Sequence, residues 1–457
     1  MKISKILLAA LALLTLLPAV QAQSFRFDFG SDSAAGGYTA VTAGTRYSEA
    51  LGYGFEPGAA PSDVVRPGRD ALTRDFVTGT EPFRFSVRLP EGNYKVTLTL
   101  GDIRGKSRTT VKSEVRRLML ESFETAPNEV KKVSFNVNVR TPKLSSGNSI
   151  KLNSREWDAE TGTVKTFTWD DKLTLQFYDS APAVCAPEIE PAAEEVVTVF
   201  IIGDSTVTDQ PSGGTWGQYL PRWFDEYVVV SNHAESGMTI KGFRFMRRWD
   251  KIMESCRPGD YLLIQLGTND EKRSGHDAMW PEEDLAGDWV RTHADPEKDY
   301  IWGLATMALE AKRHGMIPVI VSPMTKIDRS TAKSTELMTP YGINARHGAE
   351  LGECAYIDLW GMSREIVSAL GQDALPAYAD GTHTDNFGAY LFSLCIAKGL
   401  RESGLPLRDH LLPETPDFNP KDPHPTLQEF SCPVEPRRAP QRPPQPRQGG
   451  QTQFGPL

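Results

Sequence analysis

The stretch VVTVFIIGDSTV, which begins at Val196, constrains the fold more than any other part of this sequence. Its first seven residues are almost all apolar, and most are β-branched. Such a run is typical of a strand that is buried on both faces, as strands of parallel sheets are. The run ends in Gly203, Asp204 and Ser205 without an ordinary hairpin turn. We therefore expect a buried strand that delivers a serine to its own carboxyl end.

Four further apolar runs follow, and the segments between them carry apolar residues at helical spacing. The runs are YVVVSN, YLLIQLG, MIPVIVSP and AYIDL. Strands that alternate with helices require crossover connections, which make a sheet parallel and cover both of its faces with helices. Residues 195–413 are therefore predicted to form an α/β domain.

The amino-terminal part, residues 24–190, has a different pattern of short alternating runs broken by Gly, Pro, Asn and Asp. In FRFSVRL, which begins at Phe83, every second residue is apolar. This period places one side of a strand on a core and the other in water, and many such strands predict an all-β sandwich. The segment APEIEPAAEE, rich in Pro, Ala and Glu, predicts a connector between the two domains.

Both ends of the chain have distinctive compositions. Residues 1–22 combine two lysines, an apolar core, and Val20 and Ala22 at the small-residue cleavage positions, as a signal peptide does. We find no later apolar run of the roughly 18 residues that a membrane span needs, and no cysteine at the cleavage site to accept a lipid. The mature protein is expected in the periplasm or outside the cell. Residues 431–457, rich in Pro, Gln, Arg and Gly, predict a disordered tail.

Charge and cysteine content argue against two classes of partner. The net charge of −9 offers no basic field for nucleic acid. The five cysteines are scattered and lack any CxxC spacing, which disfavours a zinc site. We therefore expect no nucleic-acid partner and no zinc site. We expect no other metal and no cofactor either.

In an open parallel sheet, ligands bind beyond the carboxyl ends of the strands, where the loops converge. The four loops predicted at this rim are GDS, NHAESGMT, GTND and DGTH. Taken singly, each is more simply explained as a turn, a helix cap or a local hydrogen bond. Their shared position at one rim is what indicates a site.

The histidines narrow the choice of a base for Ser205. All eight lie at His233 or later, and only His383 has an aspartate, Asp380, three positions before it. This spacing lets the carboxylate hold one imidazole nitrogen, so that the other can accept the serine proton.

Three groups at this rim could stabilise an oxyanion. They are the Ser205 backbone N–H, the Gly237 backbone N–H and the Asn269 side-chain amide. Losing one such donor typically costs on the order of 3 kcal/mol of transition-state stabilisation.

These four loops resemble the Ser, Gly, Asn and His blocks of the SGNH (GDSL-type) hydrolases. GDSTV and DGTHTDNFGAY are similar in particular to the rhamnogalacturonan acetylesterase branch. The resemblance implies a three-layer, flavodoxin-like parallel sheet, with Ser205, Asp380 and His383 as the triad and Gly237 and Asn269 in the oxyanion hole. The segment from FDFGSDSAAGG to GYGFEPG resembles a galactose-binding-like β-sandwich, which either borders polysaccharide or serves only as a packing module.

The same resemblance implies a serine carbohydrate esterase that removes acetyl groups from a plant cell-wall polysaccharide such as rhamnogalacturonan or pectin. Two aromatic residues, Trp216 and Trp280, are candidate sugar contacts, although tryptophan is more often part of a core. Lys272 and Arg273 are candidate partners for an acidic polymer, and the alternative is that they are solvated loop charges. Two other functions stay open: a lipase- or thioesterase-like SGNH hydrolase of longer acyl esters, and a non-catalytic carbohydrate-binding protein.

Overall fold

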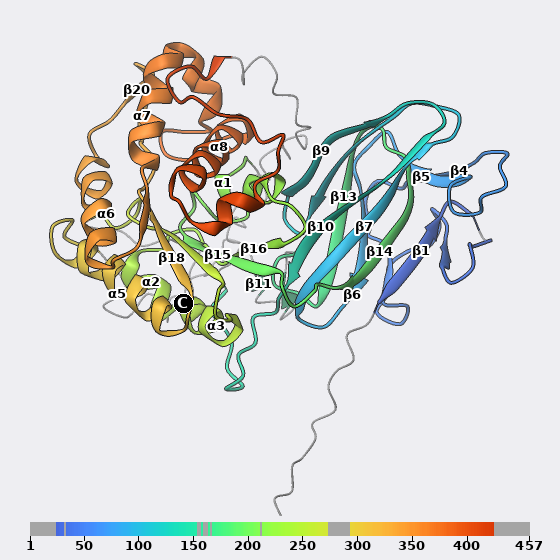
Figure 1. The fold of residues 1–457 in the computed structure, drawn as a ribbon, viewed down its shortest axis with the longest axis horizontal. Coiled ribbons are helices and arrows are strands. Elements are labelled where there is room, and N and C mark those ends of the chain that lie inside the picture. The colour runs from blue at the N-terminus through green and yellow to red at the C-terminus, as the bar shows by residue number, and fades with distance from the viewer. Residues whose placement is uncertain are drawn as a thin grey trace, which may run out of the picture.

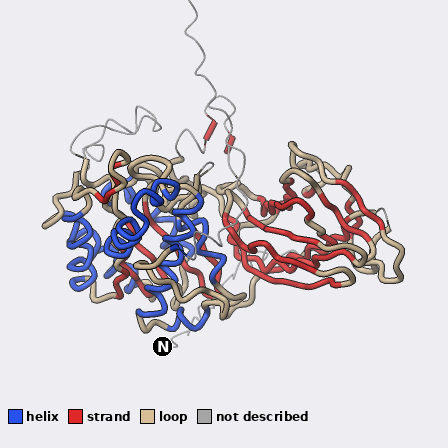
Figure 2. Tube along the Cα trace, turned by 90° about the horizontal axis from the view of Figure 1, so that it is seen from above, coloured by secondary structure: helices blue, strands red, loops and turns tan. Residues whose placement is uncertain are grey.

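The computed structural model describes residues 24–31, 33–152, 157–158, 163–164, 167–210, 213–272 and 293–424. Two bodies lie side by side, one made of strands and the other of helices around a central sheet (Figure 1, Figure 2). The predicted signal peptide, the predicted tail, Arg273 and Trp280 lie outside the described residues.

The amino-terminal body is a β-sandwich, as predicted. One sheet has the order β10-β7-β14-β1-β2, with β5 paired to β14 and β4 to β5, and the other has the order β3-β6-β13-β8-β9. The strands are β1 (Phe25–Phe29), β2 (Thr39–Val41), β3 (Tyr53–Phe55), β4 (Ser62–Val65), β5 (Asp75–Thr78), β6 (Phe83–Arg88), β7 (Gly92–Asp102), β8 (Ser107–Ser113), β9 (Arg117–Thr125), β10 (Glu129–Val139), β13 (Lys172–Ala181) and β14 (Val184–Pro191), and a small separate pair, β11 (Trp157–Asp158) and β12 (Thr163–Val164).

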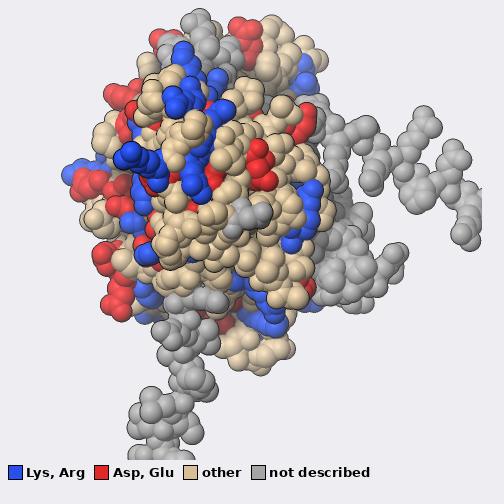
Figure 3. All heavy atoms as spheres, turned by 90° about the vertical axis from the view of Figure 1, so that its right-hand side faces the viewer, with Lys and Arg blue, Asp and Glu red and all other residues tan. Residues whose placement is uncertain are grey.

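Alternation builds the core of this sandwich. Phe83, Phe85 and Val87 of β6 are all buried, and Phe85 meets Phe27 of the opposite sheet at 5.2 Å between ring centroids. Aromatic pairs of this kind bury large apolar areas and therefore hold the two sheets together. Figure 3 looks onto the end of the sandwich, where Lys and Arg are interspersed with Asp and Glu.

The second body confirms the predicted flavodoxin-like architecture. Its five strands are all parallel, in the order β16-β15-β17-β18-β21. The strands are β15 (Val197–Gly203), β16 (Val228–Asn232), β17 (Tyr261–Gln265), β18 (Ile317–Val321) and β21 (Ala355–Ile357), and a short hairpin is formed by β19 (Ile327–Asp328) and β20 (Lys333–Ser334). Each of the five apolar runs found in the sequence is thus a strand of one sheet.

Helices cover both faces of this sheet. Val199 and Ile201 of β15 belong to one core cluster, whereas Phe200 and Ile202 belong to another, so successive residues serve opposite faces. The helices on the first face are α1 (Trp216–Tyr219), η1 (Leu220–Trp223), α7 (Leu359–Leu370), η3 (Gly371–Ala377), α8 (Asn386–Glu402) and η4 (Pro406–His410); those on the second are α2 (Ile240–Phe245), α3 (Arg248–Ser255), α5 (Asp299–Arg313) and α6 (Thr339–Leu351). None of the helices in the described part of the chain is long and apolar enough to span a membrane.

The predicted connector APEIEPAAEE is wrong in its first six residues. These residues belong to β14, which pairs with β7 from Ala186 to Pro191. The prolines are tolerated because the ladder between β14 and β1 covers only Glu188 and Ile189. The connection between the two bodies is therefore only the few residues between β14 and β15.

The sandwich contacts the edge of the α/β sheet. Strand β10 lies beside β16, and β9 lies against α1 (Figure 1). Strand β9 also contacts η1. Because β16 is the first strand in the sheet order, this contact covers what would otherwise be an exposed edge.

Candidate active site

The loop after β15 presents Ser205. A Cβ at Gly203 would come within 2.6 Å of the Val207 side chain and 2.9 Å of the Gln265 carbonyl oxygen, so this turn has no room for a larger residue. The buried Asp204 closes the turn, because its Oδ1 accepts the backbone N–H of Thr206 at 2.9 Å and the Thr206 hydroxyl at 2.8 Å. The backbone of the serine is therefore held by residues on both sides.

The three predicted triad residues lie within hydrogen-bonding distance of one another. Ser205 Oγ is 2.8 Å from His383 Nε2, and His383 Nδ1 is 2.8 Å from Asp380 Oδ2. The other carboxylate oxygen, Asp380 Oδ1, accepts the backbone N–H groups of Thr382 at 2.6 Å and His383 at 2.7 Å. This arrangement leaves Nε2 free of the carboxylate and directed at the serine, as a general base requires.

The aspartate and histidine of this triad are partly open to solvent. The Asp380 and His383 side chains are 57% and 43% exposed. Partial burial acts to raise the pKa of Asp380, but the hydrogen bonds from His383 and from the Thr382 backbone outweigh it and lower the pKa below its ordinary value. Asp380 is therefore an ionised carboxylate at neutral pH.

The predicted oxyanion-hole residues lie on the same rim. Gly237 has φ +78°, a conformation that favours glycine. The Asn269 amide donates to the Met238 carbonyl oxygen at 3.1 Å, which places it against the residue next to Gly237. The Gln210 amide donates to the Ser205 carbonyl oxygen at 3.0 Å.

The predicted substrate contact Lys272 lies next to this rim. Its Nζ donates to Asn269 Oδ1 at 2.7 Å, which fixes which end of the Asn269 amide is the donor. The ammonium group is thus a positive charge beside the candidate oxyanion hole, and its contact with substrate stays a prediction.

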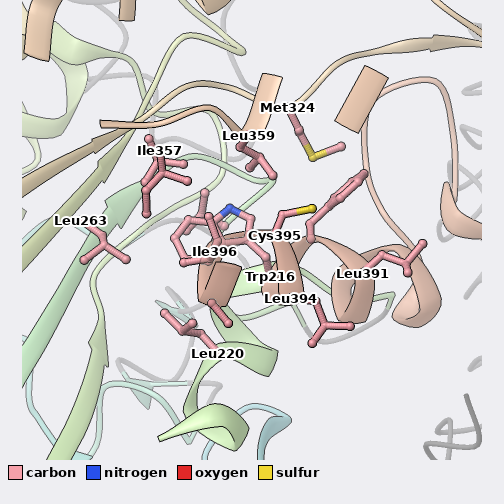
Figure 4. Packing of buried hydrophobic residues seen from close by; sticks show 14 of the residues in the cluster. Trp216, Leu220, Leu263, Met324, Ile357, Leu359, Leu391, Leu394, Cys395 and Ile396 are labelled. Carbon is pink, nitrogen blue, oxygen red and sulfur yellow. The ribbon is translucent and has the colours of Figure 1, made fainter. Parts of the chain in front are cut away.

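The predicted contact Trp216 is wrong. Its side chain is fully buried, and Figure 4 shows it among Leu220, Cys395 and Ile396 in the core beneath the sheet. Its indole N–H donates to Gln265 Oε1 at 2.7 Å. Trp216 is the first residue of α1, and its side chain packs in the core between this helix and the sheet. It therefore cannot touch sugar.

Gln265 is a supporting residue that sequence reasoning missed. Its Nε2 donates to Thr206 Oγ1 at 2.7 Å, so it links Trp216 to the turn that holds Ser205. A polar glutamine within the apolar run YLLIQLG was the available signal, because a buried amide needs partners.

Asp270 ties two loops of the rim together from beneath. Its Oδ1 accepts the Ile240 backbone N–H at 3.0 Å, which joins the GTND loop to the start of α2. The carboxyl group is fully buried, and this desolvation raises the pKa of Asp270 to about 7.

This raised pKa predicts a pH-dependent contribution to stability. Between about pH 4 and pH 7 the folded protein keeps a proton on Asp270 that the unfolded chain releases. The stabilisation of the folded state by this retained proton is therefore complete below the ordinary carboxyl pKa and is lost as the pH rises toward 7. Asp270→Asn stays neutral, so its free energy of unfolding in urea should rise relative to that of wild type as the pH increases over this window. Asp373→Asn, at an exposed position, is the control, and parallel curves for Asp270→Asn and wild type would contradict the prediction.

Among the described residues, no group of three or more His, Cys, Asp or Glu side chains is arranged to hold a metal ion. Four of the cysteines, Cys185, Cys256, Cys354 and Cys395, are free thiols in the described part of the chain.

Comparison with family models identifies both domains. Residues 201–389 match the GDSL-like Lipase/Acylhydrolase family, and residues 25–140 match the Beta-agarase/YXIM esterase-like, galactose-binding domain-like family. The chain therefore carries a GDSL-type (SGNH) hydrolase domain, that of a serine ester hydrolase, behind a galactose-binding-like domain.

Individual relatives match either most of the chain or about half of it. The chain is 25% identical to the uncharacterized esterase YxiM of Bacillus subtilis (strain 168), over 85% of this chain and 93% of YxiM. It is 29% identical to the rhamnogalacturonan acetylesterase RhgT of the same organism, over 47% of this chain and 94% of RhgT. The crystal structure of YxiM covers 84% of this chain and 99% of its own, with 23% identity and a TM-score of 0.41.

Proposed function

We propose that this protein is an exported esterase that removes acetyl groups from a plant cell-wall polysaccharide, with acetylated rhamnogalacturonan or pectin as its substrate. The observation that carries the proposal is the continuous hydrogen-bonded chain from Ser205 through His383 to Asp380. Support for the substrate comes from the acetylesterases among its relatives, named for rhamnogalacturonan.

The chain's own residues account for each step of the proposed reaction. His383 Nε2 takes the Ser205 proton as the serine oxygen attacks the acetyl carbonyl carbon, and the Ser205 and Gly237 N–H groups with the Asn269 amide stabilise the oxyanion. Collapse of the tetrahedral intermediate expels the sugar alkoxide, which receives the proton from His383. Water then attacks the acetyl-serine with the same base, releasing acetate and restoring Ser205.

The character of the rim favours a small acyl group on a polar alcohol. The side chains that adjoin Ser205 through hydrogen bonds, Gln210 and His383, are polar, and Asn269 and Lys272 follow on the same rim. The half-exposed His383 and Asp380 side chains suit a wide polymer that approaches from solvent. The signal-peptide pattern of residues 1–22 supports action in the periplasm or outside the cell.

We expect acetate release from acetylated pectin and hydrolysis of p-nitrophenyl acetate in preference to a long-chain p-nitrophenyl ester. Purified protein would be given the three substrates in parallel, with acetate and p-nitrophenol measured. A higher kcat/KM for the long-chain ester would support a lipase- or thioesterase-like enzyme instead. Binding of the polymer without hydrolysis of any ester would support a non-catalytic carbohydrate-binding protein.

A further inference from the structure

A hairpin of the sandwich is buried in the hydrolase domain beside the active-site loops. Strands β8 and β9 are joined by Glu114, Val115 and Arg116, and the first residue of β9 is Arg117. All four residues are buried, which is unusual for a hairpin tip because connections normally lie on the surface. Glu114 and Arg116 have φ of 52° and 60°, a conformation that non-glycine residues adopt only where the surroundings hold them in it.

Arg117 holds the loop that carries the nucleophile. Its Nε and Nη2 donate to Asp209 Oδ2 at 3.0 and 2.7 Å, and the two side chains are only 2% and 3% exposed. Asp209 Oδ1 accepts the Asn232 amide at 3.1 Å, and the same amide donates to the Val207 carbonyl oxygen at 2.8 Å. The segment that follows Ser205 is therefore fixed through a buried ion pair whose cation belongs to the other domain.

Arg116 holds the loop that carries the base. Its Nη2 donates to Asn386 Oδ1 at 2.9 Å, and its Nη1 donates to the carbonyl oxygen of Gly213. Asn386 is the first residue of α8, shortly after His383, and its Oδ1 also accepts the Tyr219 hydroxyl at 2.8 Å. This arginine thus joins the start of α8 to the segment before α1.

A backbone contact of the same hairpin completes the connection. Gln218 of α1 donates from Nε2 to the Val115 carbonyl oxygen at 2.9 Å and to the Gln210 carbonyl oxygen at 3.0 Å. The Gln210 side chain in turn donates to the Ser205 carbonyl oxygen. The hairpin is therefore linked to the nucleophile turn by a second route that does not pass through Asp209.

We infer that Arg116 and Arg117 are positioning residues for catalysis, through which the sandwich domain sets the distance between Ser205 and His383. The inference rests on the proposed function, because it takes Ser205 and His383 as the reacting pair. Arg116 and Arg117 are adjacent, and each hydrogen-bonds to one of the two loops that carry Ser205 and His383. Loss of either guanidinium would therefore let one loop shift relative to the other. Misplacement of reacting groups by about 1 Å can lower a rate by on the order of a hundredfold.

The test compares Arg116→Met, Arg117→Met and Arg117→Lys with wild type. We expect kcat for p-nitrophenyl acetate to fall by about a hundredfold in both Met variants, with KM changed by less than about twofold, because ground-state binding of this small ester is not affected. The rate at which phenylmethylsulfonyl fluoride modifies Ser205 should fall in parallel. Arg117→Lys keeps the charge beside Asp209 and should recover part of the loss. Among the described residues, Arg116 donates to the neutral oxygen atoms of Gly213 and Asn386, so Arg116→Met leaves no carboxylate there without its cation. This variant therefore tests the inference even if Arg117→Met does not fold.

Asn136→Ala is the matched control. This buried side chain of β10 also crosses between the domains, donating to the Glu226 carbonyl oxygen at 2.7 Å, but it does so near the amino end of β16, away from the active-site rim. It should lower the melting temperature and leave kcat unchanged. Folded arginine variants with wild-type kcat, or an equal loss in Asn136→Ala, would overturn the inference. If wild type hydrolyses no acetyl ester, the proposed function fails, whereas the rates of Ser205 modification still decide the role of the arginines.

Discussion

Replacing Ser205 by alanine should lower kcat for acetyl ester hydrolysis by roughly 10⁴- to 10⁶-fold. The physical reason is that Ser205 Oγ forms the new bond to the acetyl carbonyl carbon. The same oxygen gives its proton to His383 Nε2, which lies 2.8 Å away. Without the hydroxyl oxygen no acyl-enzyme forms, and the residual attack by water is favoured mainly by the oxyanion donors. Acetate release, measured from acetylated pectin and from p-nitrophenyl acetate, checks the prediction.

Two further variants make this result interpretable. Residues of a triad act as a unit, so Ser205→Ala combined with His383→Ala should be no slower than Ser205→Ala alone. Ser330→Ala, at an exposed serine in the β19–β20 hairpin, should retain full activity. A Ser205→Ala protein that still turns over at more than about a hundredth of the wild-type rate would show that another group is the nucleophile.

The second large effect is expected for Asp380→Asn, with kcat reduced by about 10² to 10⁴-fold. The backbone N–H groups of Thr382 and His383 both point at Oδ1, so an asparagine would keep its carbonyl oxygen there and turn its NH₂ group toward His383 Nδ1. Nδ1 would then have to accept a hydrogen bond, which moves the proton to Nε2 and removes the base.

The exposure of Asp380 sets where in this range the loss should fall. At 57% side-chain exposure, water can replace part of the carboxylate's interaction with the imidazolium, so we expect a smaller loss than in a buried triad. The kcat/KM of Asp380→Asn, measured beside that of Asp373→Asn at another exposed position, separates loss of the base from a general change of charge. An unchanged kcat in Asp380→Asn would show that His383 acts without the Asp380 carboxylate, which would contradict the assignment of Asp380 to the triad.

The parts of this structure that sequence reasoning found are those with short-range signals. A strand buried on both faces is apolar throughout, and five such runs gave the parallel sheet. The carboxyl ends of those strands meet at one rim for topological reasons, which is why residues as distant as Ser205 and His383 could be paired before their distance was known.

The parts that sequence reasoning missed depend on contacts between distant segments. Trp216 follows the nucleophile loop closely, and only the packing of α1 on the sheet shows that its ring is buried. The prolines of APEIEP suggested a connector, yet the short pairing with β1 lets them lie in a strand. Arg116 and Arg117 look like any charged pair in the sequence, because their partners lie in another domain.

The most direct test of a serine mechanism is to find the acetyl group on the protein. Wild type would be mixed rapidly with excess p-nitrophenyl acetate, quenched in acid within the first turnovers, digested, and examined by mass spectrometry. We predict a burst of p-nitrophenol and an acetyl group on Ser205, both absent from Ser205→Ala. Steady turnover by wild type without a burst, or an acetyl group on a different residue, would contradict the assignment of Ser205 as the nucleophile.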